Sequence, residues 1–305
     1  MVNIKQMNKS LGLLMVSGFL SFASAQAQLA NRYDLSDAND SVGGANGTVQ
    51  GGAVLSGGIL TTTNANNTSY LRLPGAATNP NPAPAANVSG DFSVELWATQ
   101  AGSQSGNTVV FSLASAQTNF LLLKPNNNGT GPTINFRQAG INGGNEVVAH
   151  TSANGASSIF NNGSFGAEYQ IVLTYSFNTG AFTLYRNGAQ YGNLTYQSGT
   201  TTGTVLTSLP IGFNLSSATA GAFNGINGGN PFGDNNFNGS TNDFRVYSSA
   251  LNDAQVASLF NAGPNATNAA INTIAAVPEP STWAALVAGA GALLGWQRRT
   301  RREVV

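Results

Sequence analysis

Alternating apolar and polar positions run through the middle of the chain and predict β-strands. In 92–98 large apolar residues occupy every second position from Phe92, so they share one strand face, while Glu95 and Trp97 share the other. Similar short segments, rich in Thr, Val, Phe and Tyr and separated by Gly and Asn clusters, predict further strands. They are 108–113, 119–124, 169–175 and 181–186.

Turn residues connect these segments. The segment Ser176–Gly180 lies between 169–175 and 181–186, which predicts a hairpin. Asn187 and Gly188 follow directly, and both residue types tolerate a positive φ, so they predict a second, tight turn.

One segment, 252–260, has a clear helical pattern. Val256, Leu259 and Phe260 form one apolar stripe, and Asn252 is followed three residues later by Gln255, the spacing of a capping box. Strands throughout with one short helix predict an all-β fold, a two-sheet antiparallel sandwich.

Composition narrows the function classes. The chain has 305 residues, of which 41% are hydrophobic, enough for a sizeable core, and only 8% are charged, against roughly 25% in an average protein. Between Asn31 and Ala276 six basic residues face ten acidic ones, a net charge near −4. Such a region does not neutralise phosphates, so nucleic-acid binding is not expected. The absence of cysteine excludes disulfides, thiolate metal sites and a cysteine nucleophile.

The N-terminus has the layout of a secretory signal peptide. Lys5 and Lys9 precede the apolar run 11–20, and the small residues of Ala23-Ser-Ala25 and Ala25-Gln-Ala27 follow. We therefore predict a signal peptide over 1–27, which signal peptidase removes after Ala25 or Ala27.

The C-terminus has three parts in order. Pro278-Glu279-Pro280 precedes the apolar stretch 283–296, and an arginine cluster that includes Arg298 and Arg299 follows. As a helix the apolar stretch would be about 21 Å long, shorter than a hydrocarbon core of roughly 30 Å. This order resembles the PEP-CTERM sorting signal of Gram-negative bacteria, over 277–302.

The resemblance implies a processing pathway. An exosortase would cleave near Pro278-Glu279-Pro280, after a transient inner-membrane anchoring by the short helix with Arg298 and Arg299 on the cytoplasmic side. The mature protein would then lie at the cell surface or in the extracellular matrix, where such proteins accompany exopolysaccharide or biofilm. The segment 264–276, small and polar, is predicted to be a flexible linker before this signal.

Four segments also resemble LamG-like jelly-roll domains of the concanavalin A-like lectin/glucanase group. They are 33–48, 92–97, 171–175 with 182–188, and 244–247 with Ala250-Leu251. The resemblance spans 29–263 and implies a two-sheet jelly roll. Two positions depart from the family pattern: Glu168-Tyr169-Gln170 replaces a Trp-His type of hairpin start, and Asn242 stands where Asp is common.

No residue set suggests catalysis. Glucanases of this superfamily use a Glu-x-Asp-x-x-Glu strand motif, which is missing here. Asp91 and Glu95 share a strand face but would lie about 13 Å apart at 3.3 Å per residue, too far for paired-carboxylate chemistry. We interpret Glu95 as structural and the sole histidine, His150, as a residue of a loop-like stretch, so no catalytic residue is assigned and no enzyme is predicted.

A calcium site is the remaining chemical hypothesis. Calcium prefers six to eight oxygen ligands, and the loop from Asp37 to Asp40, the run Asp234-Asn-Asn and the pair Asn242-Asp243 supply such oxygens. In LamG-like domains the terminal strands lie together, so Asp40 and Asp243 are the tentative ligands of one calcium ion. The alternative is turn chemistry, in which Asp and Asn bond their own backbone.

Two function classes follow. The first is a lectin-like module that binds glycan or exopolysaccharide, or mediates adhesion, at the cell surface. The second is a non-binding structural or glycosylated coat protein of the biofilm matrix, and a glycoside hydrolase is a third, weaker alternative. Saturable binding in a glycan array separates the first two.

Overall fold

The computed structural model describes residues 27–63, 68–74, 90–104, 107–126, 131–151, 158–160, 165–199, 203–209, 211–213 and 225–276. The predicted signal peptide up to residue 26 and the sorting segment from 277, with Pro278, Glu279, Pro280, Arg298 and Arg299, lie outside these residues. Within the described ranges, no helix combines the length and apolar character that crossing a bilayer requires.

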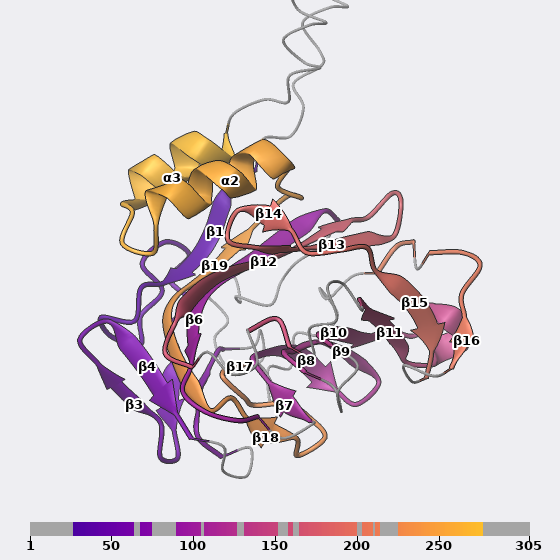
Figure 1. Ribbon diagram of the computed structural model, residues 1–305, viewed down its shortest axis with the longest axis horizontal. Coiled ribbons are helices and arrows are strands. Elements are labelled where there is room, and N and C mark those ends of the chain that lie inside the picture. The colour runs from indigo at the N-terminus through magenta and orange to yellow at the C-terminus, as the bar shows by residue number, and fades with distance from the viewer. Residues whose placement is uncertain are drawn as a thin grey trace, which may run out of the picture. The chain divides into compact units, whose positions relative to one another are not determined.

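One layer of the sandwich, sheet A, contains eight strands in the described part of the chain (Figure 1). Their order is β14-β13-β12-β6-β19-β4-β3, and β1 also pairs with β19. The strands are β1 (Leu29–Tyr33), β3 (Val54–Ser56), β4 (Ile59–Thr62), β6 (Phe92–Gln100), β12 (Glu168–Ser176), β13 (Ala181–Arg186), β14 (Ala189–Gln190) and β19 (Gly239–Tyr247). All of these pairs are antiparallel.

The other layer, sheet B, contains nine strands by the same description, in the order β16-β15-β11-β10-β9-β8-β17-β5-β2. They are β2 (Thr48–Gln50), β5 (Tyr70–Arg72), β8 (Phe111–Ala116), β9 (Asn119–Lys124), β10 (Thr133–Arg137), β11 (Val147–His150), β15 (Thr195–Ser198), β16 (Thr204–Val205) and β17 (Gly225–Ile226). A short 3-10 turn, η1 (Asn142–Gly144), precedes β11, and β7 (Thr108–Val109) pairs in parallel with β18 (Asn235–Asn236).

The predicted alternation in β6 is confirmed. Phe92, Val94 and Leu96 belong to the core between the sheets, whereas Glu95 and Trp97 lie on the outer face of sheet A. The predicted strand 108–113 is divided into β7 and β8, because Val110 leaves the ladder to bond Leu123 and Asn227. Asn187 and Gly188 have φ of 52° and 79°, as the predicted tight turn requires.

The predicted helix is present as α2 (Asp253–Ala262), and its capping box is complete. The Asn252 side chain accepts from the Gln255 amide at 2.9 Å, and the Gln255 side chain accepts from the Asn252 amide at 2.8 Å. These two bonds satisfy amides that the first helical turn leaves without partners.

The prediction of a flexible linker over 264–276 is wrong. Residues Asn268–Ala275 form a second helix, α3, with Ile271 and Ala275 fully buried against Leu29 and Val256. The spacing of Ile271 and Ala275 puts both side chains on one helix face. This short apolar stripe is enough to stabilise the helix because a neighbouring apolar surface covers it.

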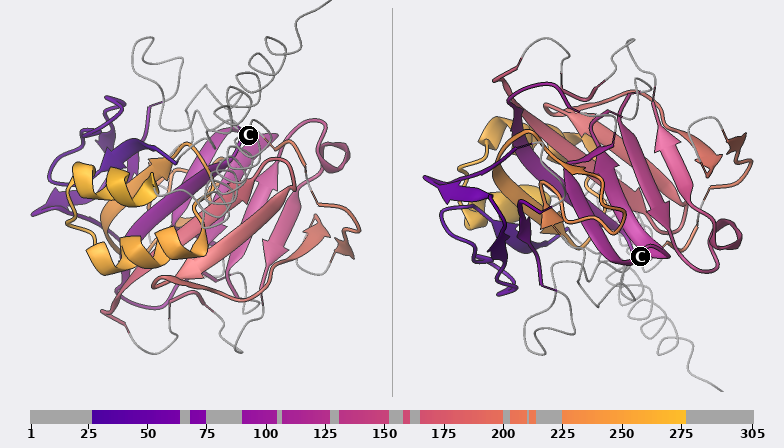
Figure 2. Two further views of the ribbon diagram at one scale, coloured as in Figure 1. Left: turned by 90° about the horizontal axis from the view of Figure 1, so that it is seen from above. Right: turned by 90° about the horizontal axis from the view of Figure 1, so that it is seen from below.

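The two helices cover the outer face of sheet A (Figure 1; Figure 2, left). They pack on Val172, Tyr185 and Tyr247 of that sheet. Residues 27–275 form one compact unit, and its two ends meet here, since the Leu29 amide donates to the Asn272 side chain at 3.1 Å. The outer face of sheet B, seen from below in Figure 2 (right), lies on the side of this unit opposite α2 and α3.

Candidate functional site

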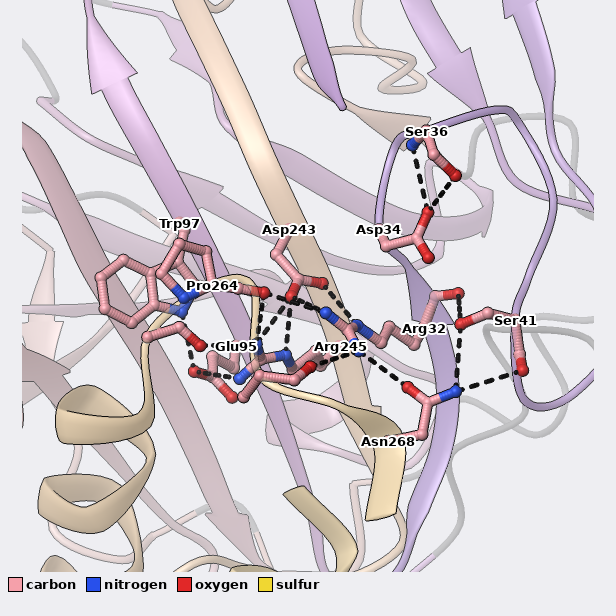
Figure 3. Close-up of polar contacts among 12 residues, drawn as sticks. Arg32, Asp34, Ser36, Ser41, Glu95, Trp97, Asp243, Arg245, Pro264 and Asn268 are labelled. Atoms are coloured by element: carbon pink, nitrogen blue, oxygen red, sulfur yellow. Dashed lines mark hydrogen bonds and ion pairs between the residues drawn. The ribbon is translucent and has the colours of Figure 1, made fainter. Parts of the chain in front are cut away.

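Four buried charged side chains lie together beneath the helices, on the outer face of sheet A (Figure 3). Arg245 contacts Glu95 at 3.0 Å and Asp243 at 2.6 Å, and Arg32 contacts Asp243 at 2.9 Å. Strand register brings them together, because Arg245 lies opposite both Glu95 and Arg32. Two positive and two negative groups make this cluster neutral, which a buried site requires.

Glu95 is held by protein donors on both oxygens. Its Oε1 accepts from Trp97 Nε1, Gln170 Nε2 and Arg245 Nη1 at 2.8–3.1 Å. Its Oε2 accepts from the Tyr247 hydroxyl at 2.5 Å. Burial, with the Glu95 charge, raises the pKa of Tyr247 well above its ordinary value, so the hydroxyl stays a donor. These contacts agree with the interpretation of Glu95 as structural.

Asp40 likewise serves the local backbone. It accepts from the Asn31 side chain at 2.5 Å and from four main-chain amides at 2.9–3.1 Å. The amide donors are Arg32, Val42, Gly43 and Ala45. This carboxylate closes the turn after β1, and Asp37 does the same for Asn39 at 2.7 Å, the turn chemistry named as the alternative to calcium.

The predicted calcium ligands do not fit the ion as they stand. Asp40 and Asp243 both contact Arg32. The Asp40 carboxylate accepts from the backbone amide of Arg32, and the Asp243 carboxylate accepts from the guanidinium of Arg32. Oxygens that face N–H donors are not free for a metal. Among the described residues, no group of three or more acidic or histidine side chains is placed to hold one. Asp234 lies elsewhere, in the loop before β18, where it pairs with Lys124 of sheet B.

A second cluster, here called the polar face, occupies the outer face of sheet B. Directly opposed residues of antiparallel strands share a face. Thr133 lies opposite Lys124 and His150, while Asn135 lies opposite Val148, which in turn lies opposite Gln197. The polar face consists of Lys124, Thr133, Asn135, Glu146, His150, Gln197 and, from the loop before β18, Asp234.

The contacts within the polar face are incomplete. Lys124 pairs with Asp234 at 3.0 Å, and the Asn135 Nδ2 donates to Glu146 at 2.6 Å. The Thr133 hydroxyl and the Asn135 Oδ1 are buried and have no hydrogen-bond partner among the described residues. Buried polar groups normally have partners, so this strip has unused hydrogen-bonding capacity.

Two groups of the polar face titrate abnormally. Burial raises the pKa of Glu146, an effect that the Asn135 amide and the Lys124 charge oppose. Burial lowers the pKa of His150, which the neighbouring Gln197 opposes. Both shifts favour the neutral forms, because a partly dry environment disfavours charge.

An exposed aromatic ring borders the polar face. Phe232 is 42% exposed, and its ring stands edge-on to Phe120 of β9 at a centroid distance of 4.9 Å. The Asn230 side chain fixes this loop by accepting from the amides of Phe232 and Asp234 at 3.0 and 3.1 Å. An exposed ring beside polar side chains offers both stacking and hydrogen bonding.

A separate cleft of about 450 Å³ opens at the sandwich edge between β13–β14 and β15–β16. Its lining combines apolar side chains, such as Phe182, Leu194 and Leu206, with polar ones, such as Gln190 and Asn193. It contains none of the residues that define the polar face.

Sequence reasoning missed most of the polar face. Thr133, Asn135 and Glu146 were not singled out, although Thr and Asn at every second position of β10 signal an outward strand face. His150 lies in β11, not in a loop, so that interpretation is corrected.

The family model described as the concanavalin A-like lectin/glucanases superfamily matches residues 65–257, more than half of the chain. The chain belongs to this superfamily. The predicted fold, mostly β with two antiparallel sheets, agrees with that membership. No curated protein matches the sequence.

Solved structures similar to this superfamily member include domain 4 of AbnA, a GH43 extracellular arabinanase from Geobacillus stearothermophilus, in complex with arabinotriose. It has 20% identity and a TM-score of 0.48, over 76% of this chain and 98% of that one. Trypanosoma rangeli sialidase has 15% identity and a TM-score of 0.49, over 84% and 39%. The CBM40 of Ruminococcus gnavus IT-sialidase, bound to α2,6-sialyllactose, has 14% identity and a TM-score of 0.40, over 68% and 96%. The chain thus spans about two fifths of the sialidase length.

Proposed function

We propose that this chain is an exported bacterial surface protein whose lectin-like domain binds glycan or exopolysaccharide on the polar face of sheet B. One observation carries the proposal: two buried polar atoms, of Thr133 and Asn135, have no partner among the described residues, and they lie on the same sheet face as Phe120, against which the exposed ring of Phe232 packs. Sugars present hydroxyl groups and apolar C–H faces together, which such a strip and ring complement.

The placement of the chain ends supports the same proposal. Ala27 and Ala275 belong to one hydrophobic cluster over sheet A, so the export signal and the sorting segment both join the domain on that side. The outer face of sheet B lies on the opposite side of the domain from this cluster (Figure 1).

A binding experiment tests this function. The full-length protein is applied to an array of neutral and acidic oligosaccharides and to the exopolysaccharide of the host strain. Phe232→Ala, at the border of the polar face, and His150→Ala, within it, should each weaken saturable binding about tenfold, equivalent to about 1.4 kcal/mol. Asn193→Ala, in the edge cleft, is the matched control and should bind as the wild type does.

Two outcomes would count against the proposal. Absence of saturable binding would favour a non-binding structural or glycosylated coat protein. Binding that Asn193→Ala removes and Phe232→Ala leaves intact would move the site to the edge cleft.

We further propose that the domain binds without cleaving. In support, Glu95 is fully occupied by donors, and the polar-face carboxylates are engaged by Lys124 and Asn135. Release of reducing ends from a bound oligosaccharide, lost in Glu146→Gln, would instead identify a glycoside hydrolase.

Export and processing complete the proposal. Signal peptidase would cut after Ala25 or Ala27, and an exosortase near Pro278-Glu279-Pro280, leaving the protein at the surface or in the biofilm matrix of a Gram-negative cell. Intact mass of the protein from its native host should therefore correspond to a chain lacking Trp283 to Val305. A native protein that retains this tail would refute the processing.

A further inference from the structure

Lys124 differs from the other cations of the domain. The sequence contains Lys5, Lys9 and Lys124, so Lys124 is the only lysine beyond the predicted signal peptide. It ends β9, is 7% exposed, and its Nζ lies 3.0 Å from the Asp234 Oδ2. The buried ion pairs beneath the helices use arginine instead, which suits permanent, hydrogen-bonded pairing. A lysine can also lose its proton and act as a nucleophilic amine, which an arginine cannot do.

The contact between Lys124 and Asp234 is close without being a hydrogen bond. Although the two atoms are 3.0 Å apart, their angles lie outside hydrogen-bond geometry, and the buried Oδ2 has no hydrogen-bond partner among the described residues. The Asp234 amide donates to the Asn230 Oδ1 at 3.1 Å, and the Asp234 carbonyl accepts from the Asn230 Nδ2 at 3.0 Å. Lys124 is fixed by the ladder between β9 and β10, opposite Thr133. Amine and carboxyl are therefore held in contact, and such positioning replaces a collision between two molecules.

Glu146 supplies a third group that acts on both partners. Burial raises its pKa, the Asn135 hydrogen bond and the Lys124 charge oppose this change, and the Asp234 charge adds to it. Glu146 therefore retains a proton more readily than an exposed glutamate does. Its Oε1 accepts from the Asn135 Nδ2 at 2.6 Å, which fixes the carboxyl group on the polar face. A positioned carboxyl group of this kind can hold and transfer protons.

We propose that Lys124 and Asp234 form an intramolecular amide bond in the folded protein, and that Glu146 holds and transfers the protons of this reaction. A proton first moves from the ammonium group to the carboxylate, which the nearly buried surroundings favour because they disfavour charge. The neutral Nζ then attacks Cγ of Asp234. A C–N bond forms, the C–OH bond breaks, and the hydroxyl leaves as water with one amine proton. The step is a condensation, so it needs neither an oxidant nor a reductant.

This bond would connect parts of the domain that are distant in sequence. It closes a loop of about 110 residues between β9 and the segment before β18, and cross-linking such a loop restricts the unfolded chain. The chain has no cysteine, so a disulfide cannot do this. The cross-linked segment also carries Phe232, whose amide donates to the Asn230 Oδ1 at 3.0 Å. The amide would therefore fasten the aromatic border of the polar face to sheet B.

Mass spectrometry of the purified, denatured wild-type protein tests the proposal. Its mass should be lower than that of its sequence by one water molecule. Digestion should yield a branched peptide that joins the segments around Lys124 and Asp234, and Lys124 should not react with an amine-reactive reagent. Lys124→Arg keeps the positive charge but has no nucleophilic amine. It should have the full mass and a Tm lower by about 10 °C, because the closed loop is lost.

Further variants separate the roles of the three groups. Glu146→Gln keeps the size of the side chain, and the cross-linked fraction should fall in this variant. Glu168→Gln, at an exposed carboxylate of sheet A, is the matched control and should be cross-linked as completely as the wild type. Equal cross-linking in Glu146→Gln and the wild type would overturn the role of Glu146.

Two results would overturn the amide bond itself. One is a wild type of full mass whose Lys124 reacts with the reagent. The other is a missing water that persists in Lys124→Arg, because it would then come from another dehydration, such as an aspartyl imide. If Lys124→Arg fails to fold, the branched peptide and the labelling of the wild type decide the question. Neither result depends on glycan binding, so the proposed function is tested separately.

Discussion

Replacing Glu95 with Gln is the most direct test of the buried charge cluster. The change keeps the size of the side chain but removes one of two negative charges that face Arg32 and Arg245. The buried cluster then carries an uncompensated positive charge. One amide must also replace a carboxylate that accepts from Trp97, Gln170, Arg245 and Tyr247.

The magnitude follows from the burial. Arg245 and Glu95 are fully buried, and removing one partner of such a pair costs about 3–5 kcal/mol. Each kcal/mol shifts the Tm of a domain of this size by about 2–4 °C, so we expect a decrease of about 10 °C. Burial alone would lower the pKa of Arg245, but Glu95 and Asp243 raise it in the wild type. In Glu95→Gln only Asp243 remains, and Arg245 still keeps its charge because arginine is not deprotonated in proteins.

The assay is denaturant unfolding of the full-length protein, followed by tryptophan fluorescence. Trp97 stacks on Phe260 of α2 at 5.8 Å, so the change in emission includes the loss of this contact when the helix leaves sheet A. Glu168→Gln, at an exposed carboxylate of the same sheet, is the control and should change stability by less than about 0.5 kcal/mol. A Glu95→Gln protein whose stability lies within about 1 kcal/mol of the wild type would refute the proposed role of this cluster.

Three smaller perturbations address other parts of the molecule. Because burial raises the pKa of Glu146, its contribution to stability is greatest below the ordinary value of 4.5 and is lost as the pH rises through the raised folded value. Glu146→Gln should therefore reduce the dependence of the Tm on pH between the ordinary and the raised pKa of Glu146. A pH profile of the Tm that matches the wild type would contradict the raised pKa. Gly188→Ala should cost about 2 kcal/mol, since its φ is 79° and its Cβ would lie 3.1 Å from Phe260, whereas Gly57→Ala, with open space, should cost about half as much in urea unfolding. Asn252→Ala should cost about 1 kcal/mol by the same assay, and equal stability would mean that the capping box is dispensable.

The amino-acid sequence alone determined the first helix and the strands at 92–98, 119–124, 169–175 and 181–186. The alternation in 92–98, the Asn-Gly turn at Asn187 and the Asn252 cap depend on neighbours two to four residues away. Such local patterns directly reflect backbone geometry, so they predicted elements that the structure confirms. The family resemblance extended this to a two-sheet fold because its segments recur in a fixed order.

Tertiary structure decided which polar residues meet. Arg32 and Asp243 are separated by 211 positions, and Thr133 reaches Lys124 and His150 only through the register of three strands. The sequence therefore marked Asp40 and Asp243 as possible metal ligands without revealing the guanidinium between them. The segment that forms α3 was predicted to be a linker, because its few apolar residues stabilise a helix only where another apolar surface covers them, and the sequence does not reveal that surface. Local order follows from local pattern, whereas charge pairing and surface chemistry follow from which distant strands become neighbours.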